Sequence, residues 1–171
     1  MNILYMHASK IQMAVEPVGR DPSAQRKRER RLQKRLGLEL PRIDETNRLT
    51  EGENALVALV FVEKQDNKLN LNRIKRDIVE AAARIGVSNI IISAFAHLGN
   101  DPATAIIARE VIESAAGKIK EVTGLVTSVV PFGWDKTFEI SVPCHPYNAA
   151  FRSFKPTARE QAAYYINWLF S

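Results

Sequence analysis

Residues 55–62 read ALVALVFV, and residues 89–95 read NIIISAF. Each stretch is apolar on both sides of an extended chain, which is typical of a central strand covered on both faces. Between them, residues 71–85 repeat apolar side chains at helical spacing and stop before Gly86, a residue that commonly ends helices. A strand, a helix and a second strand in this order predict parallel pairing through a crossover helix.

The same pattern continues on either side of these two strands. Asp101-Pro102 predicts the start of a helix that reaches to about residue 123, and residues 125–130 predict another strand. Residues 3–6 predict a short first strand. These elements predict an α/β fold with a mixed β-sheet and helices packed on it. Sites in such folds tend to lie at the carboxyl ends of the strands, which makes Val62 and residues 95–97 candidates.

Residues 131–146 (PFGWDKTFEISVPCHP) concentrate chemically active side chains. The proline and glycine at 131 and 133 predict a turn, and with it a hairpin between the strand at 125–130 and a strand that stops at Pro143. Lys136 stands at the start of this second strand. It either stabilises an oxyanion or holds a water in a site, or it is a solvated lysine on a hairpin edge. Residue types alone favour the solvated lysine.

Other catalytic patterns are weak or absent. The chain has neither of the glycine-rich loops that cradle phosphates. Its three histidines, His7, His97 and His145, all follow strands, but none is paired at the i, i+4 spacing of a helical zinc site. Cys144 is adjacent to His145, which is poor geometry for activating a thiol. We expect a buried structural cysteine and no metal site.

The composition fits one soluble domain, or one domain with an appendage. The chain has 171 residues, 46% hydrophobic and 25% charged, and a single cysteine rules out a disulfide framework. No apolar run approaches the roughly 20 residues that span a bilayer. We therefore expect a cytoplasmic protein with no membrane partner.

Positive charge is concentrated between residues 26 and 35, which hold seven basic residues and one acid. Asp21-Pro22 precedes this run as a possible helix start, with Leu32 and Leu36 as apolar anchors. Contact with a polyanion and a solvated helix or mobile loop both fit this composition. Near the end of the chain, Thr157 and Glu160 form a capping-box pattern that predicts a helix with an aromatic-rich end at 164–170. That end packs on its own domain, docks a partner or leads into a further domain.

Several motifs in colinear order resemble one known family. They are residues 95–98 (FAHL), residues 131–136 (PFGWDK) with Phe138, and His145-Pro146. Together they resemble the N-terminal editing domain of archaeal-type threonyl-tRNA synthetase. The resemblance covers residues 1–152, with a basic insertion at 17–54 outside it. Residues 153–171 are then a C-terminal helix or the start of a linker.

The resemblance implies a fold like that of D-aminoacyl-tRNA deacylases, a homodimer, and hydrolysis of serine from mischarged Ser-tRNA(Thr). It implies that Lys136 is the catalytic lysine and that His97 places the water or the ester. Family members use the 2′-hydroxyl of the terminal adenosine, so no metal or cofactor is implied.

The resemblance also implies further contacts with the substrate. The residues expected at the aminoacyl group are Val62, Ala96, Trp134, Asp135, His145 and His7. The acceptor end of tRNA(Thr) is the implied partner, and the basic residues expected at its phosphates are Arg26, Lys27, Arg28, Arg30, Arg31, Lys34 and Arg35.

Two positions depart from the family pattern. Asp135 replaces an aromatic residue before the lysine, and Ala149 replaces an acid after the His-Pro pair. These departures keep two alternatives open, a broader D-aminoacyl-tRNA deacylase and a tRNA-binding appendage that has lost hydrolysis. The chain contains no ATP site and no aminoacylation core. Ligase activity would therefore lie on a synthetase catalytic domain, in cis or in trans.

Overall fold

The computed structural model describes residues 1–15 and 22–169, apart from the side chains of residues 22–26, 28 and 164–169. Within these residues, no helix is long and apolar enough to cross a membrane. The elements follow the order β1 (Asn2–Val15), α1 (Pro22–Leu36), β2 (Leu49–Phe61), the 3-10 helix η1 (Asp66–Lys68), α2 (Leu71–Ile85), β3 (Asn89–Ala94), α3 (Ala105–Lys120), β4 (Val126–Val129), β5 (Lys136–Ser141), β6 (Ala149–Ser153) and α4 (Ala158–Leu169).

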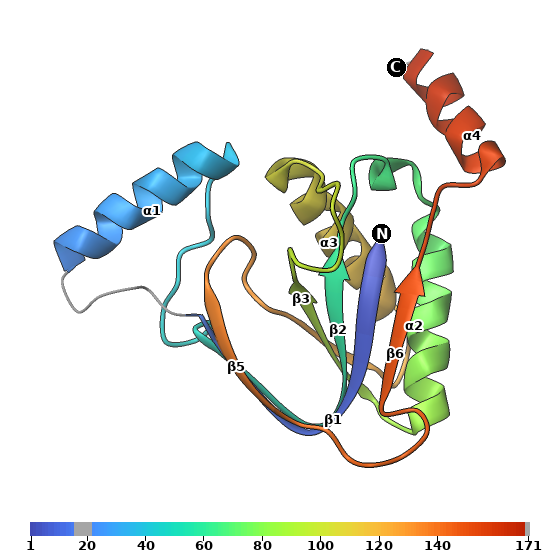
Figure 1. The fold of residues 1–171 in the computed structure, drawn as a ribbon, viewed down its shortest axis with the longest axis horizontal. Helices are drawn as coiled ribbons and strands as arrows, with labels where there is room; N and C mark the ends of the chain where they lie inside the picture. Colours follow the sequence, from blue (N-terminus) through green and yellow to red (C-terminus); the bar gives the residue numbers. More distant parts are fainter. Residues whose placement is uncertain (16–21, 170–171) are drawn as a thin grey trace.

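One mixed sheet organises the described chain. Its strand order is β4-β3-β2-β1-β5, with β6 also paired to β1. The β2-α2-β3-α3-β4 portion is parallel, and β1 runs antiparallel to β2. Figure 1 shows α2 and α3 packed on one side of the sheet and α1 near one end of β5. The predicted mixed sheet and crossover helices are confirmed.

Residues at their ends determine where the two crossover helices, α2 and α3, begin and end. The α2 helix begins after Asn70, whose side chain accepts a hydrogen bond from the backbone of Asn72, and it ends at Gly86 with φ 79°. The predicted start of α3 is wrong by three residues, because Thr104 caps that helix in place of Asp101. The backbone at Pro102 forms an isolated antiparallel bridge with Glu63, which holds this segment extended.

The predicted hairpin through residues 131–133 is wrong. β4 pairs with β3 at one edge of the sheet, whereas β5 pairs with β1 at the other. Phe132 and Trp134 pack on a leucine cluster made by α1 and the segment after it. This long-range packing draws residues 130–135 across the molecule, and a tight turn would prevent it.

β1 is far longer than the predicted strand at 3–6. Its first half pairs with β6, from Asn2 opposite Ser153 to Met6 opposite Ala149. Its second half pairs with β5, from Lys10 opposite Ser141 to Val15 opposite Lys136. No apolar run marks this second half, and neither β6 nor the early start of β2 at Leu49 has a strong local signal.

The sheet bends sharply in the middle of β1. Pairing between β1 and β2 is interrupted at Ser9 and Asn54, and Asn54 has φ 46°. Ile3 and Tyr5 pack in the core beneath α2 and α3, whereas Ile11 and Met13 belong to a second core on the opposite face. The side-chain alternation therefore shifts by one residue at the bend. This shift lets the second half of β1 curl over the face that the two helices leave uncovered.

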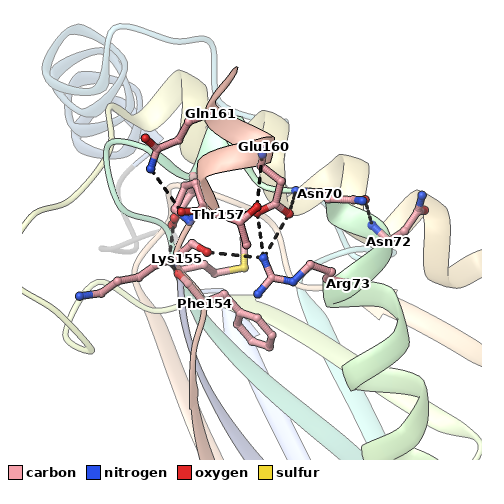
Figure 2. Close-up of polar contacts among 11 residues, drawn as sticks. Asn70, Asn72, Arg73, Phe154, Lys155, Thr157, Glu160 and Gln161 are labelled. Carbon is pink, nitrogen blue, oxygen red and sulfur yellow. Dashed lines mark hydrogen bonds and ion pairs between the residues drawn. The ribbon is translucent and has the colours of Figure 1, made fainter. Parts of the chain in front are cut away.

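The predicted capping box starts α4, and its glutamate also docks the first turn of that helix onto α2 (Figure 2). The Glu160 carboxylate accepts hydrogen bonds from Arg73 Nη1 at 2.9 Å, from Asn70 N at 2.9 Å and from Thr157 N at 2.7 Å. In return, Thr157 Oγ1 accepts from Glu160 N at 3.2 Å. The predicted aromatic end of this helix lies outside the described side chains.

Candidate active site

A cavity of about 390 Å³ opens on the face of the sheet away from α2 and α3. Three segments bound most of it, namely residues 93–97 at the end of β3, residues 132–138 around the start of β5, and the end of α1. Five of the predicted site residues line it together, and these are Ala96, His97, Trp134, Asp135 and Lys136.

Lys136 is the first residue of β5 and lies opposite Val15, which is fully buried. Its ammonium donates a hydrogen bond to the carbonyl of Trp134 at 3.1 Å. Burial lowers the pKa of Lys136, and the nearby carboxylate of Asp135 partly opposes this shift by raising it. The predicted solvated lysine on a hairpin edge is therefore wrong. The group is a partly desolvated cation that faces a cavity.

The other polar residues reach the cavity from two sides. His97 follows β3 and is exposed, with its ring edge-on to Phe95 at a centroid distance of 5.5 Å. Asp135 is also exposed and precedes the lysine. The cavity thus combines a partly buried cation, a carboxylate and an imidazole. This combination suits hydrolysis of a positively charged ester, because the carboxylate attracts the amine and the ammonium stabilises a developing oxyanion.

Trp134 holds the backbone of this stretch in place. Its indole Nε1–H donates to the carbonyl of Pro41 at 3.0 Å, and Gly133 before it adopts φ 84°. The carbonyl of Trp134 is the same group that accepts from Lys136. The segment after α1 therefore helps to orient the lysine.

The structure does not bring His7 and His145 into this cavity. They lie at the bend of β1, where Tyr147 N–H donates to His145 Nδ1 at 3.2 Å. This contact places the His145 proton on Nε2, which donates to His7 Nδ1 at 2.7 Å, and His7 Nε2–H then donates to Asn54 Oδ1 at 2.9 Å. All four ring nitrogens of the pair therefore have a hydrogen-bond partner. Their arrangement ties the loop before β6 to the bend.

Two further predictions concern single residues. Val62 does not line the cavity, because its side chain is buried in the core under the helices and its carbonyl accepts from Ala103 N at 2.9 Å. The predicted buried cysteine is wrong, because Cys144 is exposed in the connection between β5 and β6. Among the described residues, no group of three or more His, Cys, Asp or Glu could hold a metal ion.

Several apolar residues of the cavity escaped the sequence analysis. They are Leu36 of α1, Met13 of β1, Leu59 of β2 and Phe138 of β5. Two of them had a usable signal, because Leu36 follows Leu32 at the spacing of one helix turn and Phe138 belongs to the motif that carries the resemblance. A larger cavity of about 620 Å³ lies between α3 and residues 39–47. It contains none of the predicted site residues, so the chemistry favours the smaller cavity.

The basic run forms α1, as the sequence allowed. Lys27, Arg30, Arg31, Lys34 and Arg35 are exposed along the helix, whereas the side chains of Arg26 and Arg28 lie outside the described part. The predicted cap at Asp21 also falls outside it. The end of this helix stands at the wall of the cavity, so exposed positive charge continues to the edge of the candidate site.

Comparisons with known proteins identify the family of this chain. Residues 1–154 match the family described as the archaea-specific editing domain of threonyl-tRNA synthetase. The threonine–tRNA ligase of Pyrobaculum aerophilum is 31% identical over 97% of this chain and 25% of its own length. That of Thermofilum pendens is 33% identical over 69% of this chain and 20% of its own length.

The ligase of Pyrobaculum calidifontis is 40% identical over 60% of this chain and 17% of its own length. The chain thus spans a quarter or less of these relatives, and a family match over most of its residues identifies the part that it corresponds to. The chain belongs to the archaeal threonyl-tRNA synthetase editing-domain family.

Proposed function

We propose that this chain hydrolyses the ester between serine and tRNA(Thr), and so removes an amino acid attached in error. The observation that carries the proposal is the position of Lys136, a partly desolvated ammonium that faces a cavity beside Asp135 and His97. The family to which the chain belongs supports an editing role. The reaction would take place in the cytoplasm, where aminoacyl-tRNA is used.

The need for a second site follows from the similarity of the two amino acids. Serine is smaller than threonine by one methyl group and keeps the hydroxyl, so a synthetic site made for threonine excludes it poorly. A missing methyl gives only about 1–3 kcal/mol of discrimination. A second cavity that admits the serine ester and rejects the threonine ester supplies the remaining accuracy.

In the proposed mechanism, the seryl group enters the cavity with its ammonium toward Asp135. A water positioned by His97 attacks the ester carbon, and the carbonyl oxygen becomes an oxyanion next to the Lys136 ammonium. The bond from carbon to the ribose oxygen then breaks, and the ribose oxygen takes up the proton released by the water. The products are serine and tRNA with a free terminal hydroxyl. Lys136 lowers the barrier by stabilising charge that exists only in the transition state.

The exposed basic residues of α1 would hold the phosphates near the acceptor end. Such contacts release counterions, so affinity falls as salt concentration rises. A catalytic domain of a synthetase would provide the mischarged tRNA, either on the same chain or on another. Neutralising Lys27, Arg30 and Arg31 together is expected to weaken both tRNA affinity and its salt dependence.

The direct test compares wild-type protein with Lys136→Ala on tRNA carrying L-serine, L-threonine or a D-amino acid. We expect rapid loss of L-serine, slow loss of L-threonine, and a decrease of about 10²–10³-fold in the variant. Lys10→Ala is the matched control, since Lys10 is an exposed lysine on the same pair of strands outside the cavity.

Other results of this deacylation assay would support a different function or exclude the role of Lys136. Preference for the D-amino acid would assign the broader deacylase activity. No turnover of any ester by the wild type, with tRNA still bound, would leave the chain as a binding appendage. Equal rates in Lys136→Ala and wild type would remove the lysine from the mechanism.

A further inference from the structure

The basic helix α1 also has an apolar face. Leu32 and Leu36 are four residues apart and therefore lie on one side of the helix. They belong to a cluster, here called the leucine cluster, whose other members are Leu38, Leu40, Phe132, Trp134 and Ala105. Leu32 is only 7% exposed, so this face packs on the rest of the chain. The basic side chains of α1 that the structure describes are exposed, namely Lys27, Arg30, Arg31, Lys34 and Arg35.

The end of α1 is held on both sides of Leu36. Gly37 adopts φ 67° and donates its backbone N–H to the carbonyl of Gln33 at 2.9 Å, which closes the last turn of the helix. Three residues after Leu38, the carbonyl of Pro41 accepts the indole hydrogen bond of Trp134. Leu36 is therefore presented by a fixed backbone.

Leu36 lies against the same short segment that carries the lysine. A Cβ atom built on Gly133 would lie 3.2 Å from Leu36 Cδ1, and it would lie still closer to a methyl group of Leu40. The side chains of Leu36 and Leu40 thus pack directly against Gly133 and leave no room for a side chain there. A side chain larger than hydrogen at position 133 would displace the Leu40 side chain and crowd that of Leu36.

The two leucines of α1 differ in one respect. Leu36 lines the cavity together with His97 and Lys136, whereas Leu32 packs in the leucine cluster one turn earlier without lining it. Lys34 and Arg35, next to Leu36 in the chain, are exposed. A single helix therefore presents cations to the solvent and an apolar wall to the site.

We infer that Leu36 is a specificity-determining residue, which limits the size of the acyl group that fits beside Lys136. The inference rests on the proposed function and adds the structural element that excludes the larger ester. An aliphatic wall distinguishes threonine from serine by steric exclusion of one methyl group. Because the wall belongs to the helix that carries the cations, phosphate contact and acyl fit depend on the same element.

The experiment measures the ratio of kcat/KM for seryl-tRNA to kcat/KM for threonyl-tRNA in wild type, Leu36→Ala and Leu32→Ala. Leu36→Ala enlarges the cavity, and we expect the ratio to fall by about tenfold as the threonine ester gains access. Leu32→Ala removes the same atoms from the same helix face without touching the cavity. We expect it to lower stability and to leave the ratio at the wild-type value.

Three additional variants separate specificity from folding. Leu36→Met conserves volume and should keep the ratio, and Leu36→Phe narrows the cavity and should slow hydrolysis of the serine ester. Neutralising Lys34 and Arg35 to glutamine should raise KM for both esters alike. Thermal unfolding of each variant shows whether α1 stays docked.

The results distinguish this inference from the function on which it depends. An unchanged ratio in Leu36→Ala, with wild-type protein active on the serine ester, overturns the specificity role alone. The same decrease in Leu36→Ala and Leu32→Ala overturns it as well, since the effect then comes from general loosening of the helix. Wild-type protein that hydrolyses neither ester overturns both proposals.

Discussion

Lys136 and Glu160 are two charged residues that the chain partly buries, and their surroundings are opposite. Glu160 has a side chain only 12% exposed, yet hydrogen bonds from Thr157, Asn70 and Arg73 outweigh the effect of burial and lower its pKa to about 2. Lys136 donates to one backbone carbonyl, and burial lowers its pKa, which disfavours its charge. The charge of Glu160 is stabilised, whereas that of Lys136 is maintained at a cost.

This difference in surroundings indicates that the charge of Glu160 serves the structure, whereas the charge of Lys136 is a candidate for catalysis. Donors around Glu160 saturate the carboxylate and fix the start of α4, and Figure 2 shows them converging from α2 and from the turn before α4. Lys136 instead faces a cavity into which a substrate fits. Groups whose pKa is shifted by burial in a cleft are frequent at functional sites, because the substrate or the transition state supplies the partner that stabilises their charge.

The largest effect expected from this comparison concerns catalysis. Lys136→Met keeps the length of the side chain and removes its charge, so deacylation of seryl-tRNA should fall by about 10²–10³-fold. Glu160→Gln changes a charge of similar burial far from the cavity and should leave the rate unchanged. Single-turnover deacylation with excess protein measures both. A comparable decrease in the two variants would show that the distinction between the two charges is wrong.

The second effect concerns stability, because the charge of Lys136 lowers the free energy of unfolding whereas the charge of Glu160 raises it. The penalty for burying charged Lys136 is fully present below its lowered folded-state pKa and fades as pH rises toward the ordinary value of 10.5. Lys136→Met should therefore raise the free energy of unfolding at pH 7, with the gain shrinking toward pH 10. Glu160 stabilises the fold above its ordinary pKa of 4.5, and this contribution is lost as pH falls toward 2.

Glu160→Gln keeps one acceptor for the capping box and loses the ion pair with Arg73. We expect a modest loss near neutral pH, about 1 kcal/mol in the range of other helix caps, and no added loss between pH 4.5 and 2. Chemical denaturation at several pH values, with hydrogen exchange at the start of α4, gives both quantities. A variant that keeps the acid dependence of the wild type would show that another carboxylate causes it.

The smallest effect concerns the carboxylate beside the lysine. Asp135 raises the pKa of Lys136 against the larger influence of burial, so Asp135→Asn should lower that pKa further. The pH at which activity changes with the lysine should shift downward, as measured by the pH profile of kcat/KM. The same variant should raise KM if Asp135 contacts the substrate ammonium. An unchanged profile and an unchanged KM would exclude both roles.

The three histidines show which features of the site a sequence can predict and which it cannot. His97 follows a strand with a strong apolar signal, and it lines the same cavity as Lys136. The sequence predicts that His7 and His145 also follow strands, yet His7 lies within β1 and pairs with His145 near the bend of that strand. A local pattern can predict that a residue follows a strand. Whether two such residues meet depends on the order and direction of all strands in the sheet, which a local pattern does not give.

The amino-acid sequence by itself determined the β2-α2-β3-α3-β4 centre and the cap of α4. Those elements depend on apolar periodicity and on residues such as Gly86 and Thr157, whose effects act within a few positions. Only the tertiary structure decided the length of β1, the separation of β4 from β5, and the contact of Leu36 with the cavity. These features arise from packing between segments about one hundred residues apart, and no short-range pattern encodes such a contact.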